Sequence, residues 1–199
     1  MGRRSDHTRA ELRALLVKHG HTLMSEVGYA RFSGREVAKR AGYSVGTIYN
    51  ALGSLEELLA AINTKTFELW AQGLEAELAN GGEDRIASLV SGYFNFALDN
   101  PLIWSAIYEH KLPEGKTLSD TDLEGRAKLT LIVEREVAAA LPAETDLDVA
   151  RYARSLIATV HGHCSYVVSG SFALLEEKDP IGSALDRVRE SLALHCQSS

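Results

Sequence analysis

The sequence predicts an all-α fold. Apolar residues recur three and four positions apart along most of the chain, which is the spacing of one face of a helix. No segment shows the sustained apolar and polar alternation of a half-buried strand. The four prolines lie at the edges of the periodic segments or between them. These observations predict helices joined by short turns.

Four helices are predicted in the first 80 residues, and a glycine follows each. Their expected ranges are 5–27, 33–41, 44–52 and 54–80. Ser33 and Ser54 are each followed three residues later by glutamate, Glu36 and Glu57, which is the sequence of a capping box. Ser44 is the expected cap of the short third helix. The second and third helices are therefore joined by a tight turn, as in a helix-turn-helix.

Five more helices are predicted beyond residue 82, with ranges 84–98, 101–110, 120–141, 146–175 and 181–195. The helix over 146–175 is apolar on nearly its whole circumference, so we expect it to be covered on two faces. The last helix carries a single apolar stripe, which suits packing against this neighbour and against a second copy of the chain.

The composition is that of a globular protein with a real core, since 45% of the 199 residues are hydrophobic. Apolar runs stop well short of the roughly 20 residues that a membrane span needs, and no apolar segment follows the basic start of the chain. We therefore expect a cytoplasmic protein without a membrane partner. Cys164 and Cys196 are far from any CxxC spacing, which favours two reduced thiols over a disulfide or a zinc site.

Charge is divided unevenly along the chain. Residues 1–53 contain nine Lys and Arg against four Asp and Glu, a balance of +5, which leaves −11 for the remainder of a chain whose net charge is −6. A basic module on an acidic body is typical of a protein that meets a polyanion at one end only. Together with the helix-turn-helix pattern, this favours binding to the major groove of DNA.

The stretch EVAKRAGYSVGTIYNALGSLEELL, residues 36–59, resembles the signature of the TetR family of transcriptional regulators. An alanine-rich second helix, an A-G-hydrophobic-S turn, a G-T-hydrophobic-Y recognition helix and an S-x-x-E-L start of the fourth helix follow in that order. The resemblance covers about residues 8–62. It implies a helix-turn-helix DNA-binding domain over residues 1–53 and a ligand-binding and dimerisation domain over residues 54–199.

The resemblance also implies contacts to double-stranded operator DNA. Hydroxyl groups near helix N-termini are expected to hold phosphates, Arg35 and Lys39 to meet phosphates, Tyr49 to touch the backbone or a thymine methyl, and Asn50 or Val45 to read base edges. The complete predicted DNA-binding set is Ser33, Arg35, Lys39, Ser44, Val45, Thr47, Tyr49 and Asn50.

Three positions depart from the family pattern Y-x-H-F-x-S-K, and one of them, Leu52 in place of phenylalanine, only exchanges one apolar side chain for another. Ala51 stands where relatives have histidine, and Leu55 stands where they have lysine. Both replacements remove a polar group that faces phosphate in relatives. A lysine at position 55 is expected to strengthen DNA binding, unless Leu55 is buried against the rest of the domain.

The C-terminal stretch 156–175 resembles the TetR-type domain named for a Trp-His-Gly motif, with Val160-His161-Gly162 at the motif and valine in place of tryptophan. That resemblance implies a homodimer joined through its last two helices and a small-molecule cavity in each subunit. Aromatic residues and one histidine are the predicted ligand contacts: Tyr93, Phe94, Trp104, Tyr108, His161 and Tyr166. His161 is the leading candidate, because an imidazole on an apolar helix must find a partner.

The sequence therefore predicts a ligand-responsive transcriptional repressor, released from its operator by a small apolar or aromatic effector, with no catalytic residue, no metal and no cofactor. Two alternatives stay open. One is a metal sensor or metal-dependent enzyme using His161, His163 and Cys164, with His110 as a further ligand. The other is an architectural DNA-binding protein without any effector.

Overall fold

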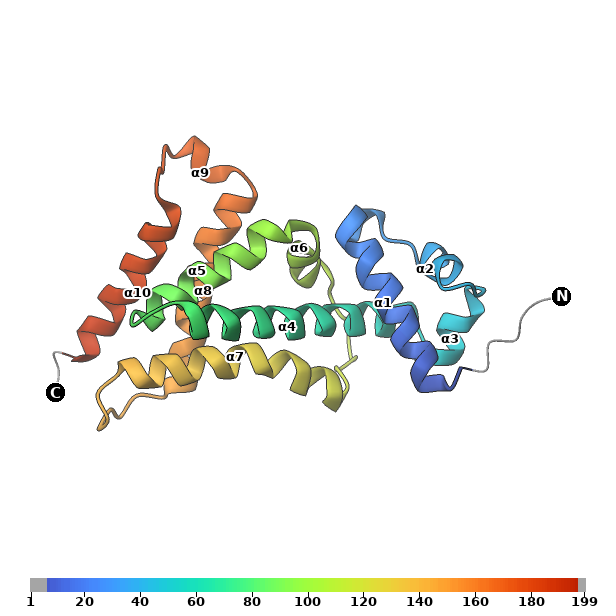
Figure 1. Ribbon diagram of the computed structural model, residues 1–199, viewed down its shortest axis with the longest axis horizontal. Coiled ribbons are helices and arrows are strands. Elements are labelled where there is room, and N and C mark those ends of the chain that lie inside the picture. Colours follow the sequence, from blue (N-terminus) through green and yellow to red (C-terminus); the bar gives the residue numbers. More distant parts are fainter. Residues whose placement is uncertain (1–6, 197–199) are drawn as a thin grey trace. The chain divides into compact units, whose positions relative to one another are not determined.

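A computed structural model describes residues 7–196, and within this range it contains ten α-helices, one 3-10 turn and no strand (Figure 1). The all-α prediction is confirmed. The backbone forms two compact units, one made of residues 7–67 with Leu102–Gly125 and the other of Glu68–Pro101 with residues 126–196. Within the described range, no helix combines the length and the apolar character that crossing a membrane would take.

The first unit is built around α1 (Arg9–Val27), which packs against both α2 (Gly34–Arg40) and α3 (Gly46–Leu52). A 3-10 turn, η1 (Tyr29–Arg31), joins α1 to α2. The shared core consists of buried apolar side chains from all three helices: Leu16, Leu23, Met24, Val37, Ala38, Ile48 and Ala51. In Figure 1 the three helices lie together at the blue end of the chain.

Capping residues set the ends of these helices. Thr8 and Glu11 form a reciprocal capping box at the start of α1, and the Ser33 hydroxyl accepts a hydrogen bond from the Glu36 amide at the start of α2. The expected cap at Ser44 is wrong, because α3 begins after Val45 and has no side-chain cap. Ser44 instead accepts the Thr47 amide through its backbone carbonyl, at 3.0 Å.

The first half of α4 (Leu55–Asn80), α6 (Pro101–Glu109) and the start of α7 (Asp120–Ala140) complete the first unit. The Ser54 hydroxyl caps α4 by accepting the Glu57 amide at 3.1 Å. Helices α1 and α4 cross closely at Gly20, where an added Cβ would lie 2.5 Å from the Ile62 Cδ1 atom. A side chain at position 20 would therefore require the Ile62 side chain to move.

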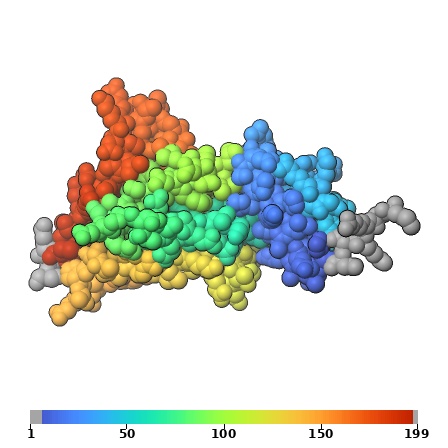
Figure 2. Space-filling model, viewed as in Figure 1, coloured from blue at the N-terminus to red at the C-terminus, as the bar shows by residue number. Residues whose placement is uncertain are grey.

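The second unit contains α5 (Arg85–Asp99), α8 (Val149–Val168), α9 (Ser171–Leu174) and α10 (Pro180–Cys196), with the remainder of α4 and α7. Helix α8 packs against both α5 and α10, which also contact each other. Figure 2 shows α9 and α10 as one continuous orange to red surface. The expectation that the α8 segment is covered on two faces is confirmed.

The predicted helix over 146–175 is wrong at both ends. Asp148 caps α8 by accepting the Arg151 amide at 3.0 Å, so the helix begins three residues later than expected. It ends at Val168 because Gly170 adopts a left-handed conformation with φ of +74°, and the short α9 follows. A glycine costs about 1 kcal/mol in a helix interior and is favoured just beyond its end, which explains why the chain breaks there.

An ion-pair network joins α4, α5 and α7 in the second unit. The buried Glu136 carboxylate accepts hydrogen bonds from Arg85 at 2.5 and 2.8 Å and from Arg135 at 2.8 Å. Arg135 also binds Glu75 of α4 at 2.8 and 3.0 Å. These hydrogen bonds, those from Arg85 most of all, lower the pKa of Glu136 against the effect of burial.

Candidate DNA interface and ligand pocket

Helix α3 has one buried face and one exposed face. Ile48 and Ala51 are buried against the rest of the first unit, whereas Val45 is 43% exposed, Tyr49 is 55% exposed and Asn50 is also exposed. Ser44, in the preceding turn, is exposed as well, and Thr47 is half-buried. Of the predicted DNA-binding residues in the turn and α3, all but Thr47 therefore lie on the exposed side.

Helix α2 carries cations beside this surface. Arg35 is exposed, and Lys39 is exposed even though its Nζ atom lies 3.8 Å from a Glu36 oxygen. Arg40 differs, because its guanidinium donates to Glu26 at 2.7 Å and to Glu36 at 3.2 Å. The two cations predicted to meet phosphates are thus more accessible than the third cation of the helix.

The two departures that remove a polar group, Ala51 and Leu55, have different surroundings. Ala51 is buried, and its carbonyl accepts a hydrogen bond from Arg9 Nε at 3.3 Å. Leu55 is half-buried at the start of α4, and its Cδ1 atom would lie 2.8 Å from a Cβ built on Gly34. Leu55 therefore packs against the first turn of α2.

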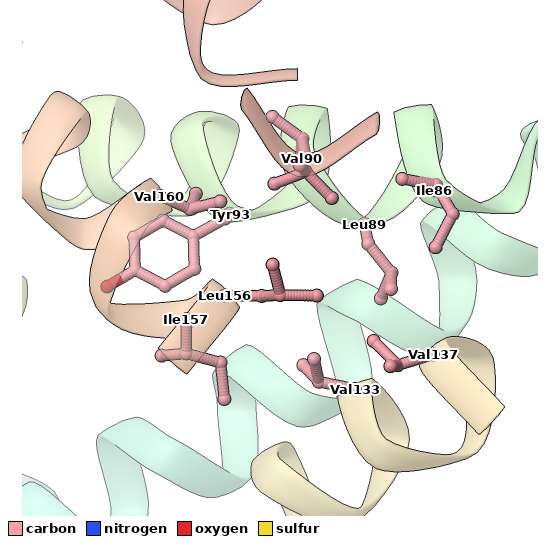
Figure 3. A pocket seen from close by; sticks show the side chains of 10 residues that line it. Ile86, Leu89, Val90, Tyr93, Val133, Val137, Leu156, Ile157 and Val160 are labelled. Atoms are coloured by element: carbon pink, nitrogen blue, oxygen red, sulfur yellow. The ribbon is translucent and has the colours of Figure 1, made fainter. Parts of the chain in front are cut away.

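A small cavity lies inside the second unit. It is bounded by side chains that converge from α5, α7, α8 and α10, and Figure 3 shows Tyr93 at one end and Ile86 at the other. Its internal space is about 40 Å³. Nine of the lining residues are aliphatic and the tenth is Tyr93: Ile86, Leu89, Val90, Tyr93, Val133, Val137, Leu156, Ile157, Val160 and Val188.

The polar group of this cavity is the Tyr93 hydroxyl, which lies 3.0 Å from His161 Nδ1. The other ring nitrogen of His161, Nε2, lies 3.2 Å from the Ser165 hydroxyl. Burial lowers the pKa of His161, so its ring is neutral near pH 7. A neutral imidazole both donates and accepts, which allows a continuous chain of hydrogen bonds from Ser165 to Tyr93.

The remaining predicted ligand contacts lie elsewhere. Phe94 is fully buried and does not line the cavity. Tyr166 is 48% exposed, in a shallow hollow with His163 and Phe172. Trp104 and Tyr108 belong to the first unit, where their rings meet edge to face with centroids 5.1 Å apart. The structure therefore brings together Tyr93 and His161 from the predicted set.

Sequence reasoning does not single out the aliphatic residues that line the cavity. The sequence feature that could have pointed to these residues is the pair of apolar stripes on α5 and α8. By themselves, such stripes indicate only core packing. Trp70, on α4, packs edge to face on Tyr93 with ring centroids 4.6 Å apart and stacks on Phe96 at 4.8 Å. This tryptophan therefore lies next to the one polar lining residue.

The arrangement around His161 does not resemble a metal site. Within residues 7–196, no three His, Cys, Asp or Glu side chains are grouped so that they could hold a metal ion. Burial raises the pKa of the Cys164 thiol to about 12, so in the metal-free protein this thiol is protonated at neutral pH.

Two sequence families match the chain. The family described as "Bacterial regulatory proteins, tetR family" matches residues 16–62, and the "Tetracyclin repressor-like, C-terminal domain" matches residues 86–189. The first match contains α2, α3 and the start of α4. The second contains every residue that lines the cavity. None of the curated proteins matches the chain.

Solved structures with a similar fold cover nearly the whole chain. A protein of unknown function from Rhodococcus sp. RHA1 is 22% identical, with a TM-score of 0.71 over 96% of this chain and 99% of its own. The multidrug binding protein EbrR, solved with imidazole, is 20% identical, with a TM-score of 0.65 over 96% and 97%. A TetR transcriptional regulator from Rhodococcus sp. RHA1 is 18% identical, with a TM-score of 0.60 over 90% and 96%. At these identities the likeness concerns the fold alone.

Proposed function

The chain belongs to the TetR family of bacterial regulatory proteins and is a DNA-binding transcriptional regulator, and on that premise we propose that it is a repressor released from its operator by a small effector. The effector is an uncharged apolar or aromatic molecule. The protein acts as a homodimer, with a DNA-binding domain over residues 1–53 and a ligand-binding and dimerisation domain over residues 54–199.

The observation that carries the effector proposal is the cavity between α5, α7, α8 and α10. Its aliphatic walls favour an apolar ligand, and none of its lining side chains carries a charge that could neutralise an ion. Tyr93, held by His161, provides one hydrogen-bonding group. Val160 and His161 belong to the Val160-His161-Gly162 sequence, so the proposal extends to the Trp-His-Gly subgroup. The similar structure of EbrR is described as that of a multidrug binding protein, and this is consistent with a small-molecule site in a protein of this fold.

The small size of the cavity suggests how an effector acts. Effectors of ordinary size need several hundred Å³, whereas the space here is about 40 Å³. An effector must therefore move the lining helices apart, and this makes the bound and free states of the second unit different. A difference of that kind is what allows ligand binding to change DNA affinity.

The surface of the second unit supports self-association. Tyr166 of α8, Leu174 of α9 and the following Leu175 are large apolar side chains exposed to solvent. Exposed apolar residues gathered on one segment are typical of protein interfaces. The proposed dimer buries this segment together with α10 and holds two recognition helices at half-sites about 34–36 Å apart.

The other predicted contacts remain part of the proposal. The DNA contacts are the eight residues predicted from the sequence. Phe94, Trp104, Tyr108 and Tyr166 remain predicted ligand contacts beside Tyr93 and His161.

The effector proposal is tested with a Trp104→Phe variant, which keeps an aromatic ring at this predicted contact and leaves Trp70, beside Tyr93, as the one tryptophan of a chain that has two. The probes are 1-decanol and 2-naphthol, which are neutral, and decyltrimethylammonium, which is a cation of similar size. We expect a neutral probe to change Trp70 fluorescence and to release the protein from operator DNA over the same range of probe concentration. A response to the cation alone would contradict the assignment of an uncharged effector.

Two substitutions on α7 provide a matched comparison. Val133→Phe fills the cavity and is expected to abolish the fluorescence response, while Leu131→Phe, at a side chain that is 59% exposed, leaves it unchanged. Thermal unfolding of both variants shows that they are folded. Equal responses in the two variants would place the effector outside this cavity.

A further inference from the structure

The segment that would enter the major groove carries no charged side chain. Residues 41–55, which include the turn and all of α3, contain no Lys, Arg, His, Asp or Glu. The commonest specific base contact is a Lys or Arg side chain bound to O6 and N7 of guanine. The turn and α3 cannot make that contact.

The same segment exposes groups that match A·T base pairs. The Val45 side chain and the Tyr49 ring are large apolar groups in contact with water, and they regain hydrophobic free energy if they pack on the C5-methyl group of thymine. The exposed Asn50 carries an amide, which can pair with N6 and N7 of adenine. At Gly46 an added Cβ would meet only the Ser44 hydroxyl, at 3.8 Å, so the backbone there is open to close approach.

On the premise that the protein binds an operator, which is its proposed function, we propose that α3 reads A·T pairs without any charged contact. Val45 and Tyr49 contact thymine methyl groups, and Asn50 binds an adenine edge. The charged phosphate contacts come from α2, where Arg35 and Lys39 are exposed while Arg40 is held by Glu26 and Glu36. Base reading and phosphate binding by charged side chains are thus assigned to different helices.

The first test removes single methyl groups from the DNA. An operator is selected from random duplexes with the full-length protein, and each thymine is then replaced by uracil in turn. Burial of one methyl group is worth about 0.8 kcal/mol, so we expect about a fourfold loss of affinity at one or more thymines of each half-site. Val45→Ala is expected to bind the thymine and uracil forms of its contact site equally.

The second test removes the N7 acceptor of adenine with 7-deazaadenine. A bidentate Asn–adenine pair is worth about 1–3 kcal/mol, so the wild type should lose at least about fivefold in affinity at one adenine. Asn50→Ala should bind both forms of that site equally. Because Asn50 is exposed, we expect this variant to keep its fold, and circular dichroism verifies this.

The salt dependence of DNA affinity distinguishes the role of α3 from that of α2. Val45→Ala and Asn50→Ala are expected to weaken binding without changing the slope of log affinity against log salt concentration. Lys39→Ala, on α2, is expected to reduce that slope by about 0.9 for each phosphate that the lysine neutralises in the wild type. A reduced slope in Val45→Ala would contradict the division of roles.

The outcomes separate this inference from the proposed function. If the selection returns no sequence above random DNA, the regulator does not recognise an operator and both fail. If an operator is found, but uracil and 7-deazaadenine are harmless while 7-deazaguanine weakens binding in an Arg35-dependent way, the operator proposal stands and the A·T reading is overturned.

Discussion

The surface formed by α2 and α3 and the cavity of the second unit differ in how they are built from the sequence. The predicted DNA contacts come from one stretch, residues 33–50, and most of them are exposed. The cavity is lined by residues between positions 86 and 188 that belong to four helices. A short motif can therefore encode the first site, whereas the second exists only after the helices have packed.

The two regions also differ in what their side chains do for stability. Tyr49 is more than half exposed and contributes little to the core. Its side chain can therefore serve DNA binding without a role in stability. Leu156 lines the cavity and is buried in the same core that holds α5, α8 and α10 together. In the second unit, folding and the proposed ligand binding therefore involve the same residues.

The largest expected effect comes from Leu156→Ala. Truncating a buried leucine costs about 2–5 kcal/mol, so we expect urea unfolding of this variant to show a loss of that size. Tyr49→Ala, the matched substitution on the DNA side, should change the free energy of unfolding by less than about 0.5 kcal/mol while weakening operator binding. Equal stability losses, or unchanged operator affinity in Tyr49→Ala at fixed salt, would remove the contrast between the two regions.

A smaller effect is expected for Glu136→Gln, because the Glu136 carboxylate is buried in an ion-pair network, whereas Arg35 and Lys39 of α2 are exposed. Hydrogen bonds to a charged group contribute about 1.5–3 kcal/mol, so the variant should be less stable than the wild type by an amount in that range at pH 7. The folded-state pKa of Glu136 lies below the ordinary value of about 4.5. Its contribution is therefore present above pH 4.5 and is lost as the pH falls through the lower folded value.

Urea unfolding at about pH 7, 5, 4 and 3 checks this dependence. The difference between the wild type and Glu136→Gln should shrink in the two most acidic solutions. Glu75 shares Arg135 and its pKa is also lowered, so Glu75→Gln is the control for the exposed part of the network. A difference that stays constant across the four solutions would show that the ion pair with Arg85 does not stabilise the fold.

The smallest effect is expected for Leu55→Lys, which lies at the edge of the DNA-binding region. Leu55 packs against Gly34, so lysine should cost about 1 kcal/mol of stability and leave the salt slope of DNA binding unchanged. Leu55→Met, which keeps the volume, is the control. A slope steeper by about 0.9 for each added phosphate contact would instead show that position 55 faces phosphate.

The local structure of the first unit is predictable because its signals lie a few residues apart. Ser33, Ser54 and the glycines at 28, 42 and 53 act on their immediate neighbours, and the structure places helix ends beside each of them. The prediction fails at Ser44 because a serine before a short helix can also use its carbonyl as an acceptor. It fails at Gly170 because the apolar residues on both sides continue the helical pattern across it.

The cavity is not predictable in the same way. The sequence shows that Leu89, Leu156 and Val188 are apolar and periodic, but a filled core and a core with a cavity require the same pattern. Aromatic residues are the natural candidates for ligand contacts, although Phe94 is packed in the core and Trp104 is in the other unit. Which apolar side chains line a cavity depends on how the helices pack against each other. The tertiary structure determines this packing, and the periodic pattern of the sequence does not.

The buried thiol of Cys164 can report how often the helices of the second unit separate. Cys196 is exposed at the end of α10 and is expected to react with a maleimide in the folded protein, whereas Cys164 lies on α8 without solvent exposure and with its pKa raised to about 12. A reagent can reach Cys164 only while α8 is transiently separated from its neighbours. The slow second phase of thiol labelling therefore measures how often this bundle opens, and an occupant of the cavity would alter that frequency directly.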